Sequence, residues 1–251
     1  MRVELTLATV SSAMCGRYTL TRHDDLVQDL QAALGESTHG EWWKPRFNVA
    51  PTQPAPVVVL RDGARMIEMM RWGLVPHWAD KSGARPPLMI NARVEGLQSK
   101  PVFRDALARK RCLVPADGFF EWKRDASAPK SKPRPMYIHP SPRHTVAFAG
   151  LWARSRIDGG EALSFTIITG PPNDLVKQIH DRMPMVLDAS SYAAWLDPSL
   201  DAEGAHALLG VPPIGDWILE PVSIRVNSAH ADDATLIEPI TVEKPTQGTL
   251  F

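Results

Sequence analysis

Apolar residues recur with a helical period near the beginning of the chain. Leu26, Leu30, Ala33 and Leu34 fall at positions i, i+4, i+7 and i+8, which is one face of an α-helix. The glycine that follows Leu34 is typical of a helix end. The pattern therefore predicts an amphipathic helix over residues 23–34.

Two apolar stretches on either side of an Asp-Gly pair predict a β-hairpin. The stretches are residues 57–60 and 66–72. Asp62-Gly63 lies between them, and this dipeptide readily adopts the positive φ angles that a two-residue hairpin turn needs.

Further short apolar stretches are separated by glycine, proline and polar residues. We expect additional strands over residues 112–120, 136–139, 145–152, 164–169 and 221–226. We expect helices over residues 174–180, 190–196 and 202–209, the first of them capped by Asn173. Strands dominate and helices are inserted irregularly between them, which predicts an α+β fold in one domain around a mixed or antiparallel sheet.

The composition is that of a globular protein with a sizeable core. The 251 residues are 44 % hydrophobic and 22 % charged, and no apolar run is long enough to span a bilayer. The chain has two cysteines, Cys15 and Cys112, which favours a reducing, cytoplasmic compartment and no disulfide framework.

The formal net charge is zero, but the two parts of the chain differ in sign. Residues 1–140 contain 21 Lys and Arg against 14 Asp and Glu, a net of +7. Residues 141–251 contain 7 against 14, a net of −7. A basic surface can therefore form from the first part, so the zero total does not exclude a nucleic-acid partner.

Four stretches place polar residues in otherwise apolar surroundings. They are residues 14–17 (MCGR), 90–95 (INARVE), 117–122 (DGFFEW) and 179–184 (IHDRMP). Taken singly, each has an ordinary explanation: a buried thiol, a turn asparagine, a solvated glutamate, or a histidine near a helix end. Together they supply a nucleophile, an amide, a carboxylate and an imidazole, which covalent chemistry on a carbonyl requires. We expect no metal site, because the eight histidines are scattered without ligand spacing.

Seven ordered motifs resemble those of the SRAP family, the abasic-site-processing proteins linked to the SOS response. The motifs are MCGRYTL (14–20), RFNVAPTQ (46–53), RWGLVPHWA (71–79), INARVE (90–95), RCLVPADGFFEW (111–122), FTIITGPPN (165–173) and IHDRMPMVL (179–187). The resemblance implies a barrel-like SRAP fold with peripheral helices that binds single-stranded DNA and couples covalently to abasic sites. It implies no cofactor, and we expect a nucleoid-associated monomer with no membrane partner.

The resemblance also assigns site residues. The family's catalytic positions match Cys15, Asn91, Glu121 and His180. Its DNA-contacting positions match Arg17, Asn48, Trp78, Arg93 and Arg182. Two departures are visible: Ala79 stands where some members have a second tryptophan, and Met183 where some have a second arginine. Fewer stacking and cationic groups bear on the tightness of DNA binding and not on the chemistry.

The implied chemistry requires Cys15 to be the first residue. An amine attacks the aldehyde of an opened abasic sugar to give an imine, and a thiol on the adjacent carbon of the same residue then closes a thiazolidine ring. Only an N-terminal cysteine carries both groups, and its α-amine, with a pKa of about 7.7–8.0, has a useful neutral fraction near neutral pH. We expect Glu121 to move protons, His180 to open the sugar and Asn91 to fix the reacting terminus.

We therefore expect residues 1–14 to be absent from the active form. The favoured route is a translation start at Met14 followed by methionine removal, and the alternative is self-cleavage before Cys15. The segment is a poor secretion signal, because Glu4 lies in the region that should be positive and Met14 is unsuited to a cleavage site. The SRAP-like domain then covers residues 15–240, followed by a tail over residues 241–251.

The tail combines a polar segment with a terminal Leu-Phe pair. Gln247, Leu250 and Phe251 resemble the Gln-x-x-Leu-Phe peptide by which bacterial repair proteins dock on the sliding clamp, whereas the alternative is that Phe251 folds back onto the domain. Two rival functions stay open: an autopeptidase or N-terminal-nucleophile hydrolase using Cys15, and a non-catalytic, clamp-tethered module that binds single-stranded DNA.

Overall fold

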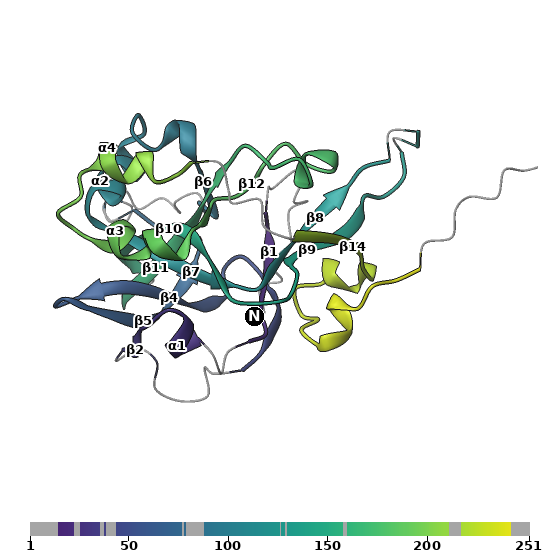
Figure 1. The fold of residues 1–251 in the computed structure, drawn as a ribbon, viewed down its shortest axis with the longest axis horizontal. Helices are drawn as coiled ribbons and strands as arrows, with labels where there is room; N and C mark the ends of the chain where they lie inside the picture. Colours follow the sequence, from purple (N-terminus) through teal and green to yellow (C-terminus); the bar gives the residue numbers. More distant parts are fainter. Residues whose placement is uncertain are drawn as a thin grey trace, which may run out of the picture.

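Figure 1 shows the protein as a computed structural model. The residues that it describes are 15–22, 26–35, 38, 44–76, 78, 88–125, 127–128, 130–157, 160–210 and 217–241. Within these ranges no helix is long and apolar enough to cross a membrane.

Five strands form a closed barrel. They are β4 (Pro54–Arg61), β5 (Ala64–Trp72), β7 (Arg111–Ala116), β10 (Val146–Ile157) and β11 (Gly160–Gly170). They pair antiparallel in the order β11-β10-β7-β4-β5, and a parallel pairing of β5 with β11 closes the ring. Closure satisfies the backbone groups that an open sheet would leave at its edges. The expected α+β class with a mixed, barrel-like sheet is confirmed.

The predicted hairpin is strands β4 and β5. Arg61 and Ala64 are the last paired residues on either side of the turn. Asp62 has φ 49° and Gly63 has φ 79°, so both central residues are left-handed, as a type I′ turn requires. The Asp-Gly pair therefore sets the register of the hairpin.

Alternate residues of the barrel strands pack on opposite faces. Phe148 of β10 belongs to a cluster with buried side chains from all five barrel strands, so this cluster fills the barrel interior, and we call it the inner cluster. Its members include Cys15, Tyr18, Val57, Trp72, Val114, Phe119, Phe148, Phe165, Ile167 and Met183. The neighbouring Ala147 and Ala149 pack instead with helical residues in an outer cluster.

Four short helices supply residues to the outer cluster. They are α1 (Leu26–Asp29), α2 (Pro101–Arg109), α3 (Tyr192–Leu196) and α4 (Ala202–Ala207). Figure 1 shows α2, α3 and α4 grouped at one side of the molecule, away from β8, β9 and β14. Helices α2, α3 and α4 therefore cover the barrel on the side remote from the second sheet.

A second sheet of five strands lies beside the barrel. Its order is β14 (Trp217–Pro221), β9 (Arg134–Pro140), β8 (Gly118–Lys123), β1 (Arg17–Leu20) and β3 (Arg46–Val49). All of these neighbours pair antiparallel. Phe119 and Tyr18 of this sheet reach into the inner cluster, so the two sheets share one core.

The single strand predicted over residues 112–120 is wrong. The chain passes from β7 in the barrel to β8 in the second sheet, and Asp117 lies between them. Its fully buried carboxylate accepts bonds from the Thr19 hydroxyl at 2.5 Å and the Thr21 amide at 2.6 Å. Bonding to β1 and its following loop turns the chain from one sheet into the other.

The helix predicted over residues 23–34 is too long. The described helix α1 ends at Asp29, and Gln31 has φ 49°, which an α-helix does not allow. Ala33–Leu34 then form β2, a short strand parallel to β5. Leu34 is 54 % exposed, so it does not belong to the buried apolar face that was predicted to include it. Residues 23–25 lie outside the described ranges.

The later helices are present in shorter form. Asn173 caps as expected, because its Oδ1 accepts the Val176 amide at 3.0 Å, but only the 3-10 turn η4 (Val176–Gln178) follows. The stretch 190–196 is η5 (Ala189–Ser191) running into α3, and 202–209 begins with α4. The predicted strands over 136–139, 145–152 and 164–169 are confirmed as β9, β10 and β11.

The strand predicted over residues 221–226 is wrong, because β14 ends at Pro221 and Ile224–Asn227 form the 3-10 turn η6. Proline lacks the amide proton that would extend the pairing. The remaining elements are β6 (Asn91–Arg93), η3 (Val94–Gly96), β12 (Met183–Pro184), β13 (Val186–Leu187) and η7 (Ala234–Ile237).

Candidate functional site

Cys15 is fully buried beside a buried carboxyl group. Its backbone nitrogen donates to Oε1 of Glu121 at 2.7 Å, and its φ of 38° is left-handed, a conformation that non-glycine residues rarely adopt. The residue lies just before β1, whose pairing with β8 brings Arg17 opposite Phe120 and so carries Cys15 to Glu121. The contact joins residues that are 106 positions apart in the chain.

Glu121 has a strongly perturbed acidity. The side chain is 2 % exposed, and this burial raises the pKa of Glu121 from 4.5 to about 8. Hydrogen bonds from the amides of Cys15 and Trp122 oppose the shift, and the negative charge of Asp181 adds to it. Glu121 is therefore mostly protonated at neutral pH and can exchange its proton near pH 8.

Burial also acts on the thiol of Cys15. Desolvation raises the pKa of the Cys15 thiol well above its ordinary value, and the negative charge of Glu121 raises it further. The thiol is therefore neutral at physiological pH and needs a base to become a nucleophile. Glu121 is the ionisable side chain that the structure places against this residue.

His180 follows η4, and its side chain is 21 % exposed. Its Nδ1 lies 3.1 Å from the amide nitrogen of Arg182 and 3.2 Å from Oδ1 of Asp181. The preceding Ile179 packs against the inner cluster, and Asp181 is close enough to Glu121 to raise its pKa. The His180 segment thus borders the Cys15–Glu121 pair.

Asn91 begins β6, which runs parallel to β11. Asn91 pairs with Ile167 of the inner cluster, whereas its neighbour Ala92 belongs to the outer cluster. Because side chains alternate along a strand, Asn91 lies on the inner-cluster side of the sheet. The structure therefore brings Cys15 and Glu121 into contact, and it places Asn91 and His180 on segments that border the same cluster.

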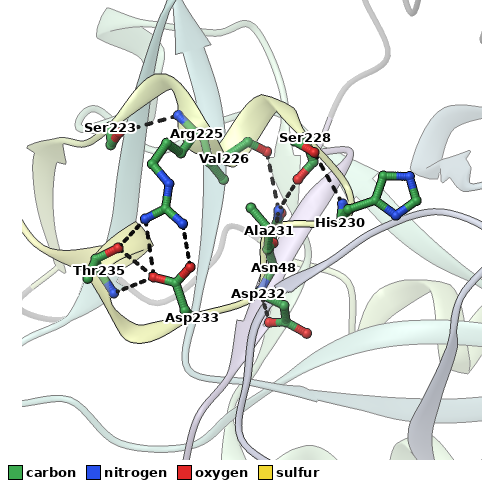
Figure 2. A network of polar contacts seen from close by, with 10 residues as sticks. All are labelled: Asn48, Ser223, Arg225, Val226, Ser228, His230, Ala231, Asp232, Asp233 and Thr235. Carbon is green, nitrogen blue, oxygen red and sulfur yellow. Dashed lines mark hydrogen bonds and ion pairs between the residues drawn. The ribbon is translucent and has the colours of Figure 1, made fainter.

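Asn48 of β3 anchors a C-terminal segment, residues 223–239. Figure 2 shows its amide pointing to this segment, where Nδ2 donates to the carbonyls of Val226, Ser228 and Ala231 at 3.3, 2.9 and 2.8 Å. In the same segment, the Asp232 carboxylate accepts a hydrogen bond from the backbone amide of Asn48 at 2.9 Å. The fully buried Asn48 side chain thus has three protein acceptors, and a DNA contact for it stays a prediction.

Arg17 contacts the same C-terminal segment. Its guanidinium donates to the carbonyls of Val226 at 2.5 Å and Asn227 at 3.3 Å, and burial lowers its pKa. Asn227 also accepts the Trp122 indole N–H at 2.8 Å. The segment therefore ties Arg17 to the residue that follows Glu121.

The other three predicted DNA contacts are Arg182 in the His180 segment, Arg93 on β6 and Trp78 after β5. Arg182 donates through Nη1 to Oε1 of Glu95 at 2.5 Å, and this pair joins the end of β6 to the His180 segment. Desolvation raises the pKa of Glu95, but the hydrogen bond and the positive charge of Arg182 outweigh this effect, and the pKa of this exposed carboxyl group is lowered. Arg93 is exposed on β6, and Trp78 is 47 % exposed. Gln247, Leu250 and Phe251 lie outside the described ranges.

Asp117 is the main contributor to the site that sequence reasoning left without a role. Besides Thr19 and Thr21 it accepts the backbone amide of Arg22 at 3.0 Å, and Tyr137 donates to or accepts from the Thr19 hydroxyl at 2.9 Å. These bonds fix β1 against β8 and so fix Cys15. The sequence did carry a signal for this role, because Asp117 is a charged residue between two apolar stretches. Among the described residues, no group of three or more His, Cys, Asp or Glu side chains could hold a metal ion.

The chain matches the family model described as SOS response associated peptidase (SRAP) over residues 14–229. It is 40 % identical over 233 residues to the abasic site processing protein YoqW of Bacillus subtilis (strain 168), across 90 % of this chain and 99 % of the relative. It is 30 % identical over 231 residues to the abasic site processing protein YedK of Escherichia coli (strain K12), across 90 % and 100 %. A solved structure from Bacteroides thetaiotaomicron shares the fold, with a TM-score of 0.76 at 23 % identity over 90 % of this chain and 100 % of that one. With its fold and its relatives in agreement, the chain belongs to the SRAP family.

Proposed function

We propose that this protein processes abasic sites in single-stranded DNA by forming a covalent thiazolidine with them through Cys15. The names of the relatives support the substrate class. The contact of 2.7 Å between the Cys15 nitrogen and Glu121 Oε1 supports the chemistry best. In a chain that begins at Cys15 this nitrogen is the attacking amine, so a carboxyl group lies within proton-transfer distance of it.

The proposed reaction consumes one aldehyde, one amine and one thiol, and releases one water. The amine adds to C1′ of the opened sugar, and the resulting carbinolamine loses its hydroxyl group as water to give an imine. The thiol sulfur then forms a bond to the same carbon while its proton passes to the imine nitrogen. The product is a five-membered ring that contains the nitrogen and sulfur of Cys15.

Glu121 suits the proton transfers of this sequence. Burial raises the pKa of Glu121 when the Cys15 nitrogen is a backbone amide, and in a chain that begins at Cys15 the same carboxyl group lies against an α-amine, with which it can exchange a proton. Glu121 takes a proton from the attacking amine and returns one to the departing hydroxyl group. Because the thiol is held neutral by burial, Glu121, which is ionised after the loss of water, takes the thiol proton and passes it to the imine nitrogen.

His180 and Asn91 act on the two reactants. His180 gives a proton to the ring oxygen of the closed sugar, which opens it to the aldehyde. Asn91 hydrogen-bonds to the reacting terminus and fixes its orientation. Both assignments rest on motif matches together with the position of the two segments beside the inner cluster.

Surface cations and one tryptophan complete the proposed DNA interface. Arg93 and Arg182 contact phosphates on either side of the lesion, and Trp78 stacks on a base. Arg17 and Asn48 hold the C-terminal segment beside the site and contribute to DNA binding from there.

The mechanism requires a chain that starts at Cys15. The family match begins at residue 14, which supports a functional start at Met14 and removal of that methionine. Self-cleavage before Cys15 is the other route to the same product. The C-terminal Gln247, Leu250 and Phe251 are proposed to dock on the sliding clamp and so bring the protein to replication forks.

Protein begun at Met14, incubated with an oligonucleotide that carries one abasic site, should give a heat-stable covalent band without borohydride. Cys15→Ala should abolish the band. Cys112→Ala, which removes the other buried thiol, is the matched control and should retain it. An equal band from Cys15→Ala would remove the proposed nucleophile. Binding without any band would favour the non-catalytic module, and turnover of peptides without DNA would favour the hydrolase.

A further inference from the structure

One residue of the C-terminal segment contacts both strands that carry the reacting groups. The backbone oxygen of Asn227 accepts a hydrogen bond from Nη2 of Arg17 on β1 at 3.3 Å. Its side-chain Oδ1 accepts one from Nε1 of Trp122 on β8 at 2.8 Å. Arg17 is two residues after Cys15, and Trp122 directly follows Glu121. Asn227 therefore links the two strands beside the Cys15–Glu121 pair.

The pairing of β1 with β8 ends at the same place. Counted toward Cys15, the last pair of the register is Arg17 with Phe120. Beyond this pair, the contact between the strands is the bond of 2.7 Å from the Cys15 nitrogen to Oε1 of Glu121. In a chain that begins at Cys15, no earlier residue holds this open end of the ladder, and chain ends are poorly ordered unless they are tied down. The position of the reacting nitrogen therefore depends on contacts made from the side of the ladder.

The contacts of Asn227 lie on the face of the sheet that is turned away from the reacting groups. Cys15 belongs to the inner cluster, whereas Trp122 packs against a third set of side chains, which we call the C-terminal cluster. The buried members of the C-terminal cluster are Phe120, Tyr137, Val222, Val226, Leu236 and Ile237. Because side chains alternate along a strand, Glu121 lies on the inner face with Cys15. Asn227 can therefore hold the two strands together without contacting the reacting atoms.

The segment that presents Asn227 is held in place by other residues. The neighbouring Val226 is fully buried in the C-terminal cluster. Figure 2 shows polar contacts on either side of it: Nδ2 of Asn48 donates to the Val226 carbonyl at 3.3 Å, and Arg225 pairs with Asp233 at 2.6 Å. The Asn227 residue itself is exposed. A change of the Asn227 side chain therefore leaves the anchors of the segment intact.

We propose that Asn227 is a positioning residue that holds the open end of the β1–β8 ladder together and so keeps Cys15 against Glu121. The inference rests on the proposed function and assigns a role to a residue that the mechanism above does not use. Asn227 acts through Arg17 and Trp122, so the loss of its side-chain bond should displace the amine from the carboxyl group for part of the time. A misplacement of about 1 Å can slow a reaction by about 100-fold. Because the bond to Trp122 is one of several contacts at this end, we expect a loss of about tenfold.

Two substitutions separate the hydrogen bond from the size of the side chain. Asn227→Leu keeps the size and removes the acceptor for the Trp122 indole, whereas Asn227→Asp keeps an acceptor. Protein begun at Met14 is mixed with an excess of abasic oligonucleotide. The rate of adduct formation and the DNA concentration that gives half of the maximal rate are both measured. Asn227→Leu should lower the maximal rate about tenfold and change that concentration by less than about twofold, and Asn227→Asp should keep the maximal rate within about twofold.

Ser228→Ala is the matched control in the same segment. It removes a side-chain oxygen that accepts the His230 amide at 3.4 Å, and it should leave the maximal rate unchanged. A wild-type rate in Asn227→Leu would overturn the inference. An equal loss in Asn227→Asp would overturn it too, because the acceptor would then not be what matters. A loss that excess DNA restores would assign Asn227 to DNA binding instead.

Alkylation of the two thiols gives a readout that needs no DNA. Cys15 and Cys112 are both fully buried, and Cys112 on β7 serves as the internal reference. Asn227→Leu should raise the alkylation rate of Cys15 relative to that of Cys112, because a local opening exposes one thiol and global unfolding exposes both. An unchanged ratio contradicts the inference. If the wild type forms no adduct, the proposed function fails, whereas this ratio still decides whether Asn227 holds Cys15 in place.

Discussion

The buried carboxyl group of Glu121 predicts an unusual dependence of stability on pH. In the 251-residue chain, where the Cys15 nitrogen is a backbone amide, the folded protein holds the Glu121 proton up to about pH 8, whereas the unfolded chain releases it near pH 4.5. One pH unit corresponds to about 1.4 kcal/mol, so this group contributes stability that is fully present below pH 4.5 and falls by about 5 kcal/mol as pH rises to 8. Above pH 8 the loss is complete, because both states are ionised.

Glu121→Gln removes this dependence at a fixed cost. The amide nitrogen of glutamine cannot accept a bond, so one of the two backbone amides that donate to Glu121 loses its acceptor, at about 1–3 kcal/mol. At pH 5 the wild type has already lost about 1 kcal/mol of the Glu121 contribution, so the variant should be less stable than the wild type by about 0–2 kcal/mol. At pH 9 it should be more stable by about 2–4 kcal/mol, the difference between the two effects.

Urea denaturation at pH 5, 7 and 9 measures both proteins. Glu203→Gln, which removes an exposed carboxylate on α4, is the matched control and should follow the wild type at each pH. The stability curves of wild type and Glu121→Gln should cross between pH 5 and 9. A constant difference between them would show that Glu121 is not held protonated in the folded protein, and the proton-transfer role would lose its physical basis.

Two further changes test the surroundings of the site. Asn48→Ala removes three hydrogen bonds to the C-terminal segment and should lower the free energy of unfolding by about 2–4 kcal/mol. Amide hydrogen exchange in residues 226–232 should become faster. Unchanged exchange would show that other contacts hold the segment. Arg182→Gln should weaken the binding of undamaged single-stranded DNA. A plot of the logarithm of affinity against the logarithm of salt concentration should have a slope smaller in magnitude by about 0.7, because one phosphate contact is lost. An unchanged slope would show that Arg182 does not contact a phosphate.

Much of the barrel could be predicted because its signals are local. The turn at Asp62-Gly63 needs two left-handed residues, and the sequence offers the pair most suited to them. The strands of β9, β10 and β11 are apolar over most of their length, because the core lies against them. Asn173 caps the turn that follows it through its own side chain, so the residue type alone was enough to predict this cap.

The parts that were missed depend on contacts between distant residues. The break at Asp117 is made by bonds to residues 19–22, almost one hundred positions earlier. Leu26 and Leu30 are buried as a helix predicts, but Leu34 turns outward because Ala33–Leu34 pair with β5. Helix α2 was also not predicted, although its signal is local: its buried residues Phe103, Ala106 and Leu107 have the i, i+3, i+4 spacing of a helix face, and Pro101 stands at its first position.

In the candidate site, too, the local signals could be predicted and the contacts between distant residues could not. The residue types and motifs identified Cys15 and Glu121, but their contact could not be derived from spacing, because the sheet pairing of β1 with β8 creates it. The protein partners of Asn48 could not be derived from its motif either, because its amide donates to three carbonyls of a segment almost two hundred residues later, and its contact with DNA stays a prediction. A single sequence shows which groups are present and not which partners satisfy them.

The central claim is that an unblocked Cys15 captures the sugar aldehyde through its amine and its thiol together. The most direct measurement is mass spectrometry of the peptide linked to abasic DNA, using protein expressed from a gene that encodes all 251 residues. The account predicts that the linked peptide begins at Cys15 and that its mass is the sum of peptide and DNA less one water, with no thiol left to alkylate. A linked peptide that still contains Met14, or one whose Cys15 thiol remains free, would contradict it.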